Sequence, residues 1–174
     1  MNQDDAIGRL ARQIDEARQS EQLLSDSATI AAARRDGVCE LHRICGAFVA
    51  AVNGKLVEGA LELSPPVWSP DTFREPGTNL FQIAFEGREM QIAFQVPAQP
   101  VSTEKFAIPY ILEGEIRTYN QPMLERFDIR STLIFLCVEK AAASWHFFEW
   151  RTRRTGPVNG ELLARLMEQL FSRP

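Results

Sequence analysis

The sequence predicts an α+β fold, in which N-terminal helices precede a six-stranded antiparallel meander sheet and a C-terminal helix packs on one face of it. Apolar residues recur at steps of three and four up to residue 53 and at steps of two from residue 55 onward. Helical spacing returns after Gly156-Pro157. The 174 residues, of which 45% are hydrophobic, are enough to bury the core of one domain.

The N-terminal helical pattern runs from residue 4 to about residue 33, as one long helix or two shorter ones. Its apolar stripe begins with Ile7, Leu10, Ile14 and Ala17, is interrupted at Glu21, and resumes in the same register at Leu24, Ala28 and Ala31. A stripe this narrow suits a partner helix, from the same chain or from a second copy. We interpret Asp36-Gly37 as a break, with Asp36 as the N-cap of a helix that ends at Asn53-Gly54. Residues 1–35 are therefore predicted to be a helical extension, and residues 36–174 a single α+β domain.

The period of two predicts six strands, at residues 56–63, 79–86, 89–97, 110–119, 124–138 and 144–153. We expect Glu86-Gly87-Arg88 to form a hairpin turn and Asn120-Gln121-Pro122 to join the fourth and fifth strands. A closing helix is expected at residues 158–171. The side chains predicted to face the helices are Phe81, Ile83, Phe85, Met90, Ile92, Phe94, Val96, Phe127, Ile129, Leu133 and Phe135.

This order of elements resembles that of helix-grip ligand-binding domains, on predicted topology alone. The chain departs from that pattern, because no strand precedes its helices and its final helix is short. Function therefore has to be argued from a site.

In a simple meander, the long loops at residues 64–78 and 98–109 lie at the same end of the sheet, and long loops are often functional. Strands five and six are apolar on both faces near that end, so something must cover them. Loops or a helix can simply fold over them, or they can form an apolar pocket or docking surface. The candidate surface residues are Trp68, Phe73, Arg74, Phe106, His146, Phe148 and Trp150.

We expect no cofactor and no metal. Cys39, His42 and Cys45 have zinc-ligand chemistry, but on a helix they spread over about 120° of arc. A fourth ligand would have to come from Cys137 or His146, so buried structural cysteines are the favoured interpretation.

Two acid–base arrangements are weighed and disfavoured. The outward face of strands four and five carries alternating charges: Glu113, Glu115, Arg117, Arg126, Asp128 and Arg130. If Gln121-Pro122 centres the turn, Glu115 lies opposite Asp128, but such a checkerboard usually only solvates a face. His146, with Glu139 as its orienting carboxylate, is the second arrangement, and a strand histidine is more often structural.

The favoured function is a non-catalytic binding or adaptor module that binds a protein partner or itself. The alternative is a protein or enzyme that binds a small apolar ligand in a cavity between sheet and helices at the long-loop end. Net charge is −4, so nucleic-acid binding is unlikely, although Arg151 to Arg154 follow an aromatic run. Three cysteines, no secretory signal and no apolar run of bilayer length predict a cytoplasmic protein without membrane contact.

Overall fold

The computed structural model describes residues 3–102 and 108–171 and confirms the predicted α+β class. Two long helices come first, α1 (Gln3–Ser25) and α2 (Ser27–Asn53). The strands are β1 (Glu62–Ser64), β2 (Asn79–Phe85), β3 (Arg88–Gln95), β4 (Tyr110–Asn120), β5 (Arg130–Glu139), β6 (Ala142–Glu149) and β7 (Arg154–Pro157). The remaining helices are η1 (Pro70–Thr72), α3 (Gln121–Glu125) and α4 (Gly160–Glu168). Over the described residues, no helix is both long and apolar enough to cross a membrane.

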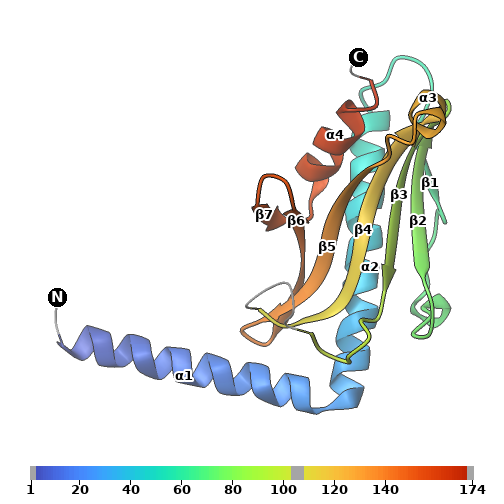
Figure 1. Cartoon of the computed structure of the whole chain (residues 1–174). Helices are drawn as coiled ribbons and strands as arrows, with labels where there is room; N and C mark the ends of the chain where they lie inside the picture. The colour runs from blue at the N-terminus through green and yellow to red at the C-terminus, as the bar shows by residue number, and fades with distance from the viewer. Residues whose placement is uncertain (1–2, 103–107, 172–174) are drawn as a thin grey trace.

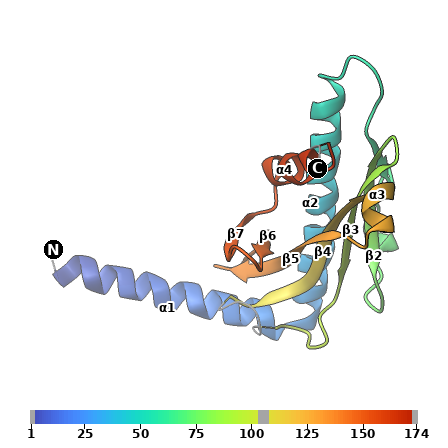
Figure 2. The same ribbon diagram turned by 45° about the horizontal axis from the view of Figure 1, so that its top comes forward.

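The sheet is the predicted antiparallel meander, with seven strands rather than six and with β1 to β7 in sequence order. The β2–β3 hairpin turns through Glu86 and Gly87, whose φ angles of 46° and 77° are those of a tight turn that glycine favours. The sheet curves around α2, and α4 lies on the same face (Figures 1 and 2). The helices therefore cover one face of the sheet, as the sequence predicts.

The main core lies between α2, α4 and the inner face of the sheet. From α2 it takes a stripe at steps of three and four residues: Val38, Leu41, Cys45 and Phe48. From the middle of the sheet it takes Phe81, Ile83, Met90, Ile92 and Phe94, all fully or almost fully buried. From α4 it takes Leu162, Leu163, Leu166 and Met167. Burial of these side chains is the main source of stability, at about 1.5–3 kcal/mol for each large one.

Helix α2 packs closely against the sheet at Gly37. The Nε1–H of Trp145 on β6 donates to the Gly37 carbonyl oxygen at 2.7 Å. A Cβ atom at Gly37 would lie 2.3 Å from a methyl carbon of Leu136 on β5. The predicted break at Asp36-Gly37 is therefore wrong. Gly37 is inside a continuous helix because only glycine leaves room for the sheet, and the N-cap of α2 is Asp26.

A buried arginine joins α2 to the loop before β4. Arg34 is 6% exposed. Its Nε donates to the Ile111 carbonyl at 3.0 Å and its Nη2 to the Pro100 carbonyl at 2.7 Å. The Glu75 carboxylate lies 3.8 Å from its Nη1. Burial lowers the pKa of Arg34, and the Glu75 charge opposes this shift. Two backbone carbonyls and a carboxylate thus compensate for the burial of this cation.

The inward side of strand five differs from the prediction. Helix α3 occupies residues 121–125, so β5 begins only at Arg130. The inward residues of β5 are Thr132, Ile134, Leu136 and Val138, and Leu133 and Phe135 face the opposite side. Phe127, predicted to be inward, is 93% exposed, and Ile129 is 45% exposed. The prediction was wrong because an extra turn of helix shifts the register by an odd number of residues.

Two other predicted boundaries also differ. Of the predicted first strand at residues 56–63, only Glu62 and Leu63 are paired, and β1 continues to Ser64. The predicted last strand at residues 144–153 ends early, because β6 stops at Glu149 and residues 150–153 form a turn into β7, a strand that the sequence did not predict. The proposed division after residue 35 stays a prediction, and its boundary falls inside α2.

We predict that Gly37→Ala destabilises the protein by roughly 1–3 kcal/mol, because the added methyl group overlaps Leu136. The matched control is Gly46→Ala in the same helix, where the nearest atom to the new Cβ is a Leu63 methyl carbon at 3.9 Å. Gly46→Ala should stabilise by about 0.5–1 kcal/mol through helix propensity. Urea unfolding measures both, and changes of the same sign would contradict the close approach at Gly37.

We predict that Arg34→Met destabilises the protein by about 2–4 kcal/mol, because two buried carbonyls lose a charged donor. The neighbouring Arg35 is exposed. Arg35→Met should therefore change the unfolding free energy by less than about 0.5 kcal/mol. Equal effects of the two substitutions in denaturant titrations would show that Arg34 does not hold the loop.

Candidate interaction surfaces

Helix α1 carries an apolar stripe that nothing in the described structure covers. Ile7 is 58% exposed, Leu10 56% and Ile14 46%, and Ala17 is also exposed. The steps of three, four and three between these residues place them on one side of the helix. Figure 1 shows why the stripe is uncovered: α1 leaves the end of α2 and projects away from the sheet.

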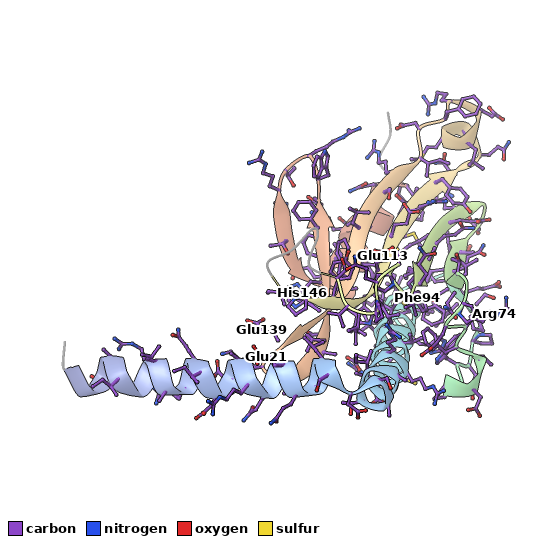
Figure 3. All side chains as sticks on the ribbon, turned by 60° about the horizontal axis from the view of Figure 1, so that its bottom comes forward. Glu21, Arg74, Phe94, Glu113, Glu139 and His146 are labelled. Atoms are coloured by element: carbon purple, nitrogen blue, oxygen red, sulfur yellow. The ribbon has the colours of Figure 1, made fainter. Side chains whose placement is uncertain are left out.

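The C-terminal part of α1 is held in place by the β5–β6 turn. Lys140 Nζ lies 3.6 Å from Glu16 Oε2, and the Ala141 backbone N–H donates to Ser20 Oγ at 3.4 Å. Lys140 and Ala141 both have positive φ, so this turn keeps a conformation that L-residues rarely adopt. Figure 3 shows Glu21 of α1 beside Glu139, where β5 enters the turn. The contacts fix one end of α1 and leave the end with the stripe free.

The direction in which α1 projects is set by the helix junction. Asp26 caps α2, since its carboxylate accepts from the backbone N–H groups of Ala28 and Thr29 at 3.3 and 3.2 Å. The Thr29 hydroxyl also donates to it, and this bond is the largest cause of the lowered pKa of Asp26. Leu23 and Leu24 pack against the core just before the junction. The apolar side chains of α1 therefore pack against the core at its C-terminal end and face solvent towards its N-terminal end.

A second uncovered apolar surface is a groove between α2, α4 and the end of β2. Its volume is about 600 Å³. It is lined by Phe48, Val52, Leu56, Leu61, Phe85, Ala164, Met167, Glu168 and Phe171. Phe171 is 48% exposed, and its ring lies 5.9 Å from that of Phe85. The Arg88 guanidinium sits 4.5 Å from the centre of the Phe171 ring, a cation–π contact that fixes this wall. The groove is concave and almost wholly apolar, and therefore suited to an apolar ligand or side chains.

The sequence did not predict this groove. Its lining comes from α2, the loop between α2 and β1, the end of β2, and α4 with the residues that follow it. It lies beside the Glu86-Gly87 turn, at the opposite end from the long loops. One feature of the sequence points to an apolar surface in this region. Leu56 and Val57 continue the apolar pattern beyond the predicted helix end at Asn53-Gly54, where solvent-exposed polar residues are usual.

The residues predicted to form one surface are divided between distant parts of the fold. Trp68 and Phe73 pack against the main core, and the Trp68 ring meets Phe81 edge to face at 5.0 Å. The Trp68 Nε1–H is buried and has no hydrogen-bond partner among the described residues. Arg74 is exposed, although its backbone N–H is bound by Asn79 at 2.9 Å. Phe106 lies outside the described residues.

His146, Phe148 and Trp150 belong to β6 and its following turn. Phe148 joins Tyr110, Phe135 and Cys137 in a small cluster on the outer face of the sheet, which Ile108 of the preceding loop helps to cover. Trp150 is 79% exposed beside the exposed Arg151, Arg153 and Arg154. The strands β2 and β6 are four positions apart, or about 19 Å, so Arg74 and His146 are far from each other (Figure 3).

The structure does not assemble either acid–base arrangement. Glu115 pairs with Leu133 across β4 and β5, not with Asp128, because α3 replaces the predicted tight turn. Its carboxylate accepts from Arg117 and, at 2.6 Å, from Ser131. His146 Nε2 lies 3.0 Å from Ser144 Oγ. Glu139 pairs with Ala142, four residues or about 13 Å along β6 from His146.

The three residues with zinc-ligand chemistry, Cys39, His42 and Cys45, lie in different environments. His42 Nε2 lies 2.8 Å from the Pro65 carbonyl oxygen, and its ring packs on Phe81. Cys45 is in the core, where burial raises its pKa to about 12. Within residues 3–102 and 108–171, no three metal-ligating side chains are grouped. The three cysteines are free thiols.

We predict that an aromatic disulfide reagent modifies Cys39 in the native protein and reaches Cys45 and Cys137 only on unfolding. Cys39 is half-buried, whereas burial raises the thiol pKa to about 12 at Cys45 and about 11 at Cys137. Peptide mass spectrometry after labelling with and without denaturant identifies the modified residues. Native labelling of Cys45 at the rate of Cys39 would disprove the core placement of α2.

Comparison with known proteins identifies no relative. No protein-family model, curated protein or solved structure matches the chain.

Proposed function

We propose that this chain is a non-catalytic protein-interaction module that self-associates through α1. The observation that carries the proposal is the exposed stripe of Ile7, Leu10 and Ile14 on a helix that projects from the domain. Large aliphatic side chains on one side of a surface helix normally face a partner. A second copy is the partner that is always present at the same concentration, and dimers with two-fold symmetry are the commonest soluble oligomers.

The way α1 is held also supports this role. Contacts with Lys140, Ala141 and the core order its C-terminal part before any partner binds. Pre-ordering of an interaction segment lowers the entropic cost of association. The three free thiols support a reducing compartment, so we place the module in the cytoplasm.

A second candidate function is the binding of a small apolar ligand. The groove of about 600 Å³ between α2, α4 and β2 favours it, because its volume is within the range of ligand sites. The sequence-based version of this proposal placed the cavity under Trp68 and Phe73, whereas the groove lies at the other end of the sheet.

We predict that Leu10→Glu abolishes self-association, because it puts a charge in the middle of the apolar stripe. The matched control is Gln19→Glu, which adds the same charge on another side of α1. Both positions are exposed, and Leu, Gln and Glu have similar helix propensities. Sedimentation velocity over a hundredfold concentration range should show an oligomer for the unaltered chain and for Gln19→Glu, and a monomer for Leu10→Glu. A monomeric unaltered chain at every concentration would overturn the proposal.

A further inference from the structure

The stripe on α1 is short for a coiled coil of two α1 helices. A stable seam needs apolar a and d residues sustained over three or four heptads. The large exposed residues of the stripe stop at Ile14, the following seam positions are Ala17 and Glu21, and Leu24 packs against the core of its own chain. Both Ala17 and Glu21 are exposed. A pair of α1 helices would therefore bury only three large side chains from each copy.

The groove offers the apolar surface that a second α1 lacks. Its lining includes the rings of Phe85 and Phe171, of which Phe171 is 48% exposed, while Phe48 and Met167 also line it but are almost fully buried. A groove of this kind receives the apolar face of an amphipathic helix through anchors spaced i, i+3 and i+7. Ile7, Leu10 and Ile14 have that spacing and span about 10.5 Å of helix.

The stripe does not contact the groove of its own chain. The groove is at the C-terminal end of α2, and α1 starts from the N-terminal end (Figures 1 and 2). The α2 helix of 27 residues is about 40 Å long. Lys140 and Ala141 hold α1 so that it points away from the body. The free part of α1 is therefore presented to another molecule.

We infer that the groove of one copy receives the stripe of α1 from a second copy. The inference rests on the proposed function, since it names the acceptor site for self-association. Leucine and isoleucine side chains enter beside the aromatic rings, and the stripe and the groove are buried in one contact. Because stripe and groove are different surfaces, the contact is heterologous, and it closes into a dimer only if each copy supplies both.

Chemical crosslinking between two variants tests the acceptor directly. One chain carries Ala11→Cys beside the stripe, the other carries Ala164→Cys in the groove, and both carry Cys39→Ser. The two are mixed and treated with a short bis-maleimide. We expect a crosslinked dimer that contains one chain of each kind. Ala32→Cys, exposed near the start of α2, replaces Ala164→Cys in the control and should give no such product.

A second measurement leaves α1 unaltered. Phe171→Glu places a charge in the groove wall and should weaken self-association at least tenfold in sedimentation. Phe127→Glu is the matched control, since Phe127 is 93% exposed and lies beside α3, and it should leave association unchanged. Circular dichroism and urea unfolding establish that both variants fold.

The possible outcomes separate this inference from the proposed function. If Ala11→Cys crosslinks only to itself and Phe171→Glu still associates, α1 pairs with α1, and the groove inference is wrong while self-association stands. If Phe171→Glu associates normally and an apolar dye binds the groove of the oligomer, the groove is a ligand site and the inference also fails. A monomer at every concentration overturns both.

Discussion

The contact between α2 and the inner face of the sheet is the interaction on which the rest of the structure depends. It depends on a glycine, because a Cβ atom at Gly37 would overlap the side chain of Leu136 on β5. Trp145 fixes the distance with a hydrogen bond to the Gly37 carbonyl, and Arg34, one turn earlier, ties the helix to the loop before β4. With α2 held there, the sheet can curve around it, and α4 can close the same face.

The sequence predicts the parts of this fold whose side chains follow one period without interruption. The strands β2 and β3 alternate strictly around Glu86-Gly87, and the α2 stripe keeps its spacing through Phe48. The prediction fails where a residue type is compatible with two different local structures. Asp36-Gly37 has residue types typical of a helix break, but Gly37 lies inside α2, where it lets the helix pack against Leu136. Asn120-Gln121-Pro122 has residue types typical of a tight turn, but α3 begins at Gln121 with Pro122 in its first turn, and this helix reverses the faces of β5.

The two candidate surfaces also differ in whether the sequence predicts them. The stripe on α1 was visible in the sequence, because it depends on three residues of a single helix. The groove was not, because its lining comes from several parts of the chain, and only the fold brings Phe48, Phe85 and Phe171 together. The predicted surface at the long-loop end includes Trp68, in the loop before β2, and His146 on β6, and the strand order places β2 and β6 four positions apart. Aromatic residues in a long loop proved to be core residues, as at Trp68.

The central claim is that the free part of α1 is an assembly element, and hydrogen exchange of its backbone amides tests this most directly. An isolated helical segment that packs on nothing exchanges fast at any protein concentration. We predict that amides around Leu10 become protected as the concentration rises, while those of α2 around Leu41 are protected throughout. Exchange around Leu10 that stays fast and independent of concentration would contradict the account.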